Sequence, residues 1–276
     1  MKRMMFVLLS AFAAGSFLGI VLKPPVREVE PKVEEKKEDA VTYPQPRWQT
    51  QDVIGKKDLR LGSVLSDIRS HINDGGYYDD GDKVTSGHET THGINSMVRN
   101  RLYKGKPINA FYCLEGKVSV LEEPRTRIEV VAREVPRSLR GGVYGLYMVE
   151  QASTWGDRAL YILDEWVCYT NGSAVRKDLG MSGRSETVLY MLEFDVYVMT
   201  LAKVLEDLEP GYSSGGFKDF VRWNVERSMS LYNGEREAAE YLERLRVNAD
   251  AAGLRSFMIG YFGRRWCVDV LGVRGV

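Results

Sequence analysis

Two histidines and a glutamate in the stretch TSGHETTHGIN have the types and spacing of a metal site. His88 and His92 stand four residues apart, and Glu89 follows the first histidine directly. Positions four apart share one face of a helix, so both imidazoles can bind a single Zn²⁺ ion. Glu89 then lies beside the metal without being forced to bind it, and from there its carboxylate can act as a general base on a water molecule.

The surrounding sequence is typical of a helix that begins after a polar loop. The loop NDGGYYDDGD precedes the motif, Thr85 or Ser86 is placed to cap a helix, and the helical pattern runs from about residue 84 to residue 103. The chain has three histidines, and this motif uses two of them. The alternative interpretation is a solvated helix face on which the histidines are incidental.

The string HETTH, residues 88–92, resembles the HExxH signature of zinc metallopeptidases. The resemblance implies that His88 and His92 bind zinc, that Glu89 is the general base, and that the substrate is a peptide or a protein. The metzincin form of the signature has a third histidine six residues on, but this chain has Val98 there and no histidine after His92. The resemblance is therefore to the gluzincin group, in which a downstream acidic residue is the third ligand.

Glu165 is the best match to such an acidic ligand. It lies between the apolar groups LYIL and WVCY, where a carboxylate without a compensating cation is costly, and a bound metal removes that cost. Its neighbour Asp164 is the alternative ligand, or else holds a histidine from behind. Tyr147, Tyr161 and Tyr169 lie near this segment in the sequence and are candidates for stabilising an oxyanion.

The N-terminal part of the chain indicates export and a linker. Lys2 and Arg3 precede an uncharged run that is long enough to span a bilayer core. We interpret residues 1–22 as a transmembrane anchor or a cleaved signal segment, so the body lies outside the cytoplasm, either membrane-anchored or secreted. Residues 23–56 are rich in proline and charge and are expected to form a disordered tether to a single domain, residues 57–276.

Periodic patterns in the body predict a mostly α fold with a small β element, that is, an α+β class. Helical spacing begins near Leu59, and the stretch 186–208 is apolar almost all round, as expected of a central buried helix. Alternating residues predict a β-hairpin near 107–120, which can offer an edge strand to an extended peptide. Further helices are predicted within 144–170, near 216–232 and near 235–250. The resemblance implies a helical, zincin-like catalytic domain.

Charge and cysteine content exclude other classes of function. The 38 basic residues balance 38 acidic ones, and no basic stripe is present, so nucleic acid is not an expected partner. Cys113, Cys168 and Cys267 show no CxxC spacing, which excludes a cysteine-rich zinc module and a disulfide scaffold. The oligomeric state is left open.

Two other functions compete with a peptidase. One is a binding or structural module of the cell envelope in which the zinc is not catalytic, and the other is a zinc hydrolase that acts on a non-peptide bond. A structural zinc site normally has four protein ligands. The few histidines and cysteines of this chain offer little to complete such a set, so the sequence favours the enzyme.

Overall fold

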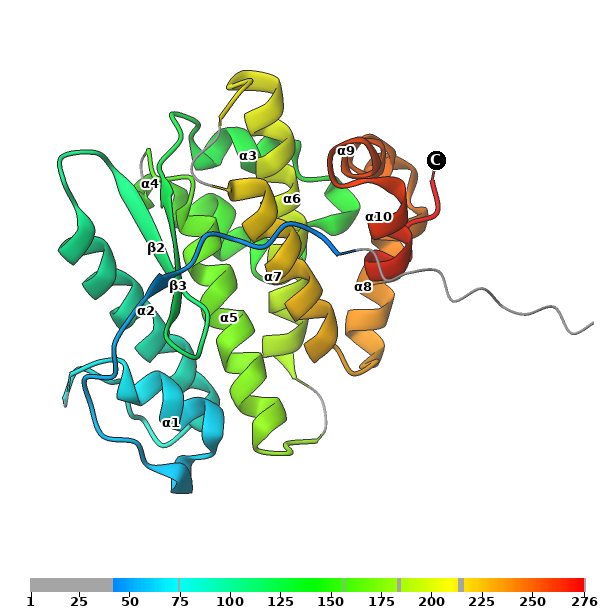
Figure 1. Cartoon of the computed structure of the whole chain (residues 1–276). Helices are drawn as coiled ribbons and strands as arrows, with labels where there is room; N and C mark the ends of the chain where they lie inside the picture. The colour runs from blue at the N-terminus through cyan, green and yellow to red at the C-terminus, as the bar shows by residue number, and fades with distance from the viewer. Residues whose placement is uncertain (1–41, 74, 156, 183–184, 213–215, 276) are drawn as a thin grey trace, which may run out of the picture. The chain divides into compact units, whose positions relative to one another are not determined.

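The folded body is built mostly from helices, with one small sheet (Figure 1), which confirms the expected class. The computed structural model describes residues 42–275, except 74, 156, 183–184 and 213–215. The α-helices are α1 (Ser63–Ser70), α2 (Lys83–Leu102), α3 (Ile128–Glu134), α4 (Ala152–Trp155), α5 (Tyr161–Asp178), α6 (Glu186–Leu208), α7 (Phe217–Leu231), α8 (Arg236–Val247), α9 (Ala252–Phe262) and α10 (Arg264–Leu271). A π-helix, η3 (Tyr144–Glu150), precedes α4, and the 3₁₀ turns are η1 (Leu59–Leu61), η2 (Arg137–Leu139) and η4 (Ala249–Ala251).

The centre of the body is a row of helices packed side by side, α2 against α5, α5 against α6, and α6 against α7 (Figure 1). The central helix predicted over 186–208 has the bounds of α6, and its residues from Met191 to Ala202 are all buried. Helix α5 is almost as deeply buried. The stretch 144–170 divides into η3, α4 and the start of α5, and the two later helices are α7 and α8, as predicted.

Helix α2, which carries the histidine motif, is capped by Asp82. Its carboxylate accepts hydrogen bonds from the backbone N–H groups of Val84 and Thr85, which satisfies donors that a helix start leaves unpaired. The cap expected at Thr85 or Ser86 is therefore wrong. Those residues lie inside the first turn, where the Ser86 hydroxyl donates to the backbone oxygen of Tyr78 in the preceding loop.

The predicted hairpin is formed by β2 (Ile108–Tyr112) and β3 (Lys117–Glu122), with Ile108 opposite Glu122. A short strand, β1 (Gln49–Thr50), pairs with the other edge of β3, so the antiparallel order is β1-β3-β2. Leu114 and Glu115 adopt positive φ at the turn, and the Asp67 carboxylate accepts from the Glu115 N–H at 2.9 Å. Strand β2 lies against α2 and α5, so the hairpin supports the helix pair.

The boundary between linker and body differs from the expectation. The tether was expected to continue to residue 56, but β1 joins the sheet, Gln51 is buried, and the Trp48 ring contacts the Trp223 ring of α7. The body therefore begins before residue 57. Within the described part of the chain, no helix combines the length and apolar character needed to cross a bilayer. The anchor or signal expected at residues 1–22 lies outside the described residues.

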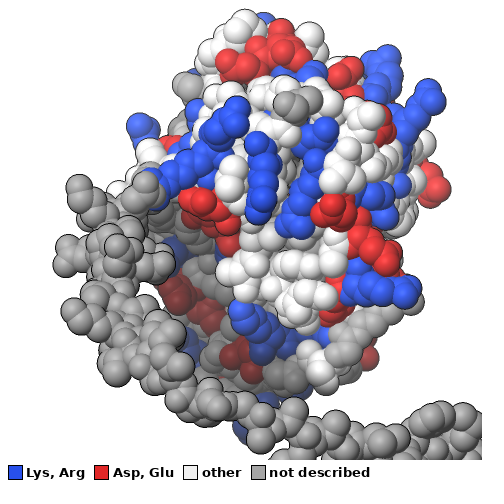
Figure 2. All heavy atoms as spheres, turned by 90° about the vertical axis from the view of Figure 1, so that its right-hand side faces the viewer, with Lys and Arg blue, Asp and Glu red and all other residues white. Residues whose placement is uncertain are grey.

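The surface formed by α8, α9 and α10 carries charges of both signs. Figure 2 shows the face with α8, α9 and α10, where basic and acidic side chains lie interspersed. Arg236 pairs with Glu240, and Arg246 with Glu243, at one-turn spacing on α8. Exposed pairs of this kind are worth little to stability, so the face is an ordinary solvated one.

Two buried asparagines lock the helix pair to the end of β2. Asn95 of α2 accepts from the Tyr112 N–H at 2.7 Å, and Asn171 of α5 donates to the Tyr112 carbonyl at 2.9 Å. Asn171 also donates to the Thr91 hydroxyl of α2 and accepts from Arg227 of α7 at 2.6 Å. One buried backbone unit therefore fixes α2 and α5 relative to each other.

Replacing Asn171 with alanine should destabilise the fold. The Tyr112 carbonyl and the Arg227 guanidinium would each lose a buried partner, which costs roughly 2–4 kcal/mol of unfolding free energy. Urea unfolding followed by circular dichroism measures this. Asn100→Ala, on the exposed face of α2, is the control and should change the unfolding free energy by less than about 0.5 kcal/mol. Equal effects of the two changes would contradict the locking role of Asn171.

Candidate metal centre

The structure brings three of the predicted site residues together where α2 packs against α5. The Nε2 atoms of His88 and His92 lie 3.2 Å apart. Glu165 Oε2 lies 3.6 Å from the first and 3.5 Å from the second. Two ligand atoms bound about 2.1 Å from one tetrahedral Zn²⁺ are about 3.4 Å apart. The three atoms therefore have the spacing of ligands that share one zinc ion.

The buried carboxylate of Glu165 is suited to binding a cation. The residue is 7% exposed, and its Oε2 atom has no hydrogen-bond partner among the described residues. Burial acts to raise its pKa, but the facing side chains of His88 and His92 outweigh this effect and lower the pKa to about 2. A buried, ionised oxygen without a partner is costly, and a metal between it and the histidines removes that cost.

Glu89 lies at the edge of this cluster and stays open to solvent. Its side chain is 44% exposed, with Oε1 4.0 Å from His88 Nε2. Glu89 does not belong to the group of converging ligand atoms, which come from His88, His92 and Glu165. Glu89 also lines a small cavity of about 150 Å³ next to the cluster; the other lining residues are Val84, Thr85, His88, Tyr147, Tyr169 and Thr187. A water molecule or a substrate can therefore reach it.

Asp164 lies behind His92 and not beside the other two ligands. Its Oδ1 atom is 3.3 Å from His92 Nδ1 and accepts a hydrogen bond from Asn95 at 2.6 Å. A carboxylate on Nδ1 places the proton there and leaves the Nε2 lone pair free for a metal. The geometry thus favours Glu165 as the third ligand and gives Asp164 the alternative role, that of orienting a histidine.

A second group of donor atoms, from His92, Asp164 and Cys168, also lies within metal-binding distance. It is less suitable, because the Asp164 oxygen is already bonded to Asn95. Burial raises the pKa of the Cys168 thiol far above its usual range, and a thiol must lose its proton to bind a metal. Cys168 is therefore a packed core residue.

The other candidates from the sequence fall into two sets. Tyr147 and Tyr169 line the cavity, and their hydroxyl oxygens lie 2.9 Å apart. The Tyr169 ring contacts His88, with centroids 4.4 Å apart. Tyr161 instead lies against Trp155 and is not part of the cavity wall. The third histidine, His71, is buried beside Tyr112 and does not belong to the cluster.

The hairpin does not offer an open edge strand beside the site. At Tyr112 both backbone groups of β2 are used by α2 and α5, the N–H by Asn95 and the carbonyl by Asn171. At Tyr112 this edge is therefore not open to the extended peptide that was expected there. Sequence reasoning missed Asn95, although its position three residues after His92 on the same helix is a signal for it.

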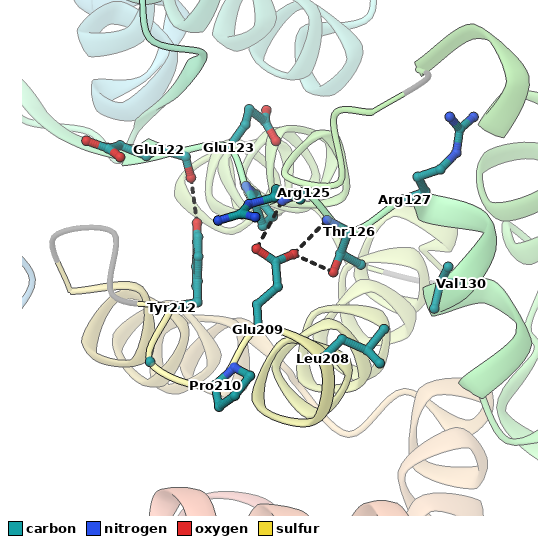
Figure 3. Close-up of a pocket in the computed structure, with 12 residues that line it drawn as sticks. Glu122, Glu123, Arg125, Thr126, Arg127, Val130, Leu208, Glu209, Pro210 and Tyr212 are labelled. Atoms are coloured by element: carbon teal, nitrogen blue, oxygen red, sulfur yellow. Dashed lines mark hydrogen bonds between the residues drawn. The ribbon is translucent and has the colours of Figure 1, made fainter.

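A larger cavity than the one beside Glu89 lies elsewhere and shares none of these residues. Figure 3 shows it between the end of β3, the start of α3 and the segment after α6, with a volume of about 750 Å³. Glu209 in its wall accepts from the backbone of Arg125 and Thr126, and the Tyr212 hydroxyl donates to the Glu122 carbonyl. These bonds tie the chain together, so the size of the cavity does not mark it as the site.

No protein-family model, curated protein or solved structure matches this chain. The three converging donor atoms, the partnerless Glu165 oxygen and the exposed Glu89 are thus the features on which a function can be based.

Metal analysis should find one zinc ion per chain in wild-type protein purified with zinc and dialysed. His92→Ala and Glu165→Gln should reduce zinc to background, because each removes one of three ligands. Asp164→Asn should retain the ion but bind it roughly 10–100-fold more weakly, since only the orientation of His92 is affected. Competition with a chromophoric chelator measures the affinity.

The third histidine provides the control for this experiment. His71→Gln should keep one zinc per chain, once circular dichroism shows that the variant is folded. If Glu165→Gln keeps zinc and Asp164→Asn loses it, the assignment of the third ligand is reversed.

Proposed function

We propose that this protein is a zinc-dependent metallopeptidase that hydrolyses peptide bonds, with its body outside the cytoplasm. The observation that carries the proposal is the convergence of His88, His92 and Glu165 on one point beside an exposed glutamate. Three protein ligands leave a fourth position of a zinc ion open, as catalytic sites require. Supporting this, the cluster adjoins a cavity and is not sealed in the core.

Each residue then has a distinct role. Zinc, when bound, polarises the scissile carbonyl and makes water a better nucleophile at neutral pH. Glu89 accepts the proton of the attacking water and delivers a proton to the leaving amine, because its carboxylate is close to the ligands but not among them. Asp164 holds His92 from behind.

The tyrosine pair can supply the hydrogen bond that an oxyanion needs. Tyr147 and Tyr169 share the cavity wall with His88 and Glu89. Burial, and then the charge of Glu165, raise the pKa of Tyr147 to about 12. Its hydroxyl therefore stays protonated at neutral pH and can donate to the carbonyl oxygen as negative charge develops there.

A zinc hydrolase that acts on a small non-peptide bond is the second candidate. Two observations favour it: the cavity beside Glu89 is small, about 150 Å³, and the β2 edge at Tyr112 is closed. A non-catalytic zinc module is less well supported, because a structural site normally has four ligands and is closed to water.

The N-terminal segment completes the proposal. If residues 1–22 anchor the chain, the peptidase works at the membrane surface, and if they are cleaved it is secreted.

Glu89→Gln should keep one zinc per chain and lower kcat for peptide hydrolysis by roughly 1,000-fold, because the amide cannot accept the proton of water. A mixture of unstructured peptides, analysed by mass spectrometry, serves as the substrate. Glu240→Gln, the same change on the distant helix α8, should leave the rate unaltered. Full hydrolysis by Glu89→Gln would exclude the proposed mechanism. If a zinc-loaded wild type cleaves small esters or amides but no peptide, the second candidate is correct.

A further inference from the structure

The π-helix η3 carries Tyr147 to the metal cluster. The Gln151 N–H donates to the Leu146 carbonyl five residues before it, at 2.9 Å, and π-helical turns are rare and frequent at functional sites. The Tyr147 ring packs against Tyr169 and against Phe194 of α6, with the Phe194 centroid 5.3 Å away. The position of the Tyr147 hydroxyl therefore depends on how η3 is held over α6.

Glu193 of α6 holds the start of this segment. Its two carboxylate oxygens accept one hydrogen bond each, from the Gly142 N–H at 2.9 Å and the Val143 N–H at 3.0 Å. The Tyr197 hydroxyl donates to the same carboxylate at 3.3 Å. Glu193 is 1% exposed. Two backbone donors immediately before η3 are thus bonded to one buried side chain of the central helix.

The neighbouring glycine makes this contact possible. A Cβ atom at Gly141 would overlap the Glu193 carboxyl group, so only glycine lets the backbone approach closely enough for the next two amides to reach the oxygens. The segment has a second attachment, because the Tyr144 hydroxyl donates to the Ala132 carbonyl at 2.9 Å. That bond holds η3 to α3, whereas Glu193 holds it to the helix that also carries Phe194.

We propose that Glu193 is a positioning residue that clamps the amides of Gly142 and Val143 and thereby places the Tyr147 hydroxyl beside the zinc ligands. The inference rests on the proposed function in one respect, the role of Tyr147 in hydrolysis. The effect of Glu193 on the stability of η3 can be measured without a substrate. Glu193 touches neither the ligands nor the cavity, so it acts only through η3.

Hydrogen exchange tests the clamp directly on the full-length chain. Glu193→Gln keeps the size of the side chain but replaces one acceptor oxygen with an NH₂ group. That group cannot accept a hydrogen bond from the Gly142 or the Val143 N–H, so the amides of residues 142–151 should exchange at least tenfold faster. Amides of α2 and α5 should be unchanged. Gly141→Ala, which acts on the same contact from the other side, should have the same effect. Glu206→Gln, the same change at an exposed site of α6, is the control. Unchanged exchange in both clamp variants would overturn the proposal.

Kinetics on the zinc-loaded variants test the role of Tyr147. Tyr147→Phe should lower kcat roughly 100-fold, as the loss of an oxyanion donor does, and Glu193→Gln roughly tenfold, with KM within about twofold and one zinc per chain. The double variant should be no slower than Tyr147→Phe alone, because both changes act through one hydroxyl.

The outcomes separate the two proposals. If Glu193→Gln lowers kcat by the same factor in the Tyr147→Phe background as in wild type, the positioning role is overturned. Glu193 would then act by a route that does not involve the Tyr147 hydroxyl. A zinc-loaded wild type without any hydrolytic activity would overturn the proposed function, and the exchange experiment would still decide the clamp on its own.

Discussion

A carboxylate buried among apolar side chains needs a compensating charge or a hydrogen-bond donor, and the candidate site is built around one, Glu165, that is faced by two histidines. Glu165 stands on a helix that is buried almost throughout, yet Oε2 has no hydrogen-bond partner and faces two imidazole nitrogens. The arrangement holds only if α2 and α5 keep their register. That register depends on the bonds from Asn95 and Asn171 to the backbone of Tyr112.

Much of this could be predicted from local sequence patterns. The spacing of His88 and His92 requires only one helical turn, and the apolar neighbours of Glu165 indicate its burial. The bounds of α6 and the hairpin follow from periodicity, which depends on near neighbours in the chain. The choice of Glu165 over Asp164 was open in the sequence, and the structure favours it because the two residues lie on different sides of His92.

The features that could not be predicted depend on contacts between distant segments. In the sequence Asn171 is an ordinary polar residue, and its role becomes visible only from its bonds to Tyr112 of β2 and Arg227 of α7. The closed edge of β2 follows from the same contacts. The early start of the body has a similar cause, because β1 is held in the sheet by pairing with β3, which lies far along the chain. Charge and proline content describe the linker but contain no information on where it meets a sheet edge.

Three of the four buried acids on α5 and α6, namely Glu165, Glu193 and Asp195, show why burial alone does not identify a ligand. Asp195 accepts from the Trp166 indole at 2.7 Å, and burial raises its pKa well above the usual range. Glu193 is satisfied by two backbone amides. In the described part of the chain, Glu165 differs from the other two because its pKa is lowered, to about 2, and because its Oε2 atom faces two histidines without a hydrogen bond. Burial makes all three costly, and their partners then distinguish a core acid, a proposed clamp and a candidate ligand. A cation shared with His88 and His92 would satisfy the Oε2 atom of Glu165.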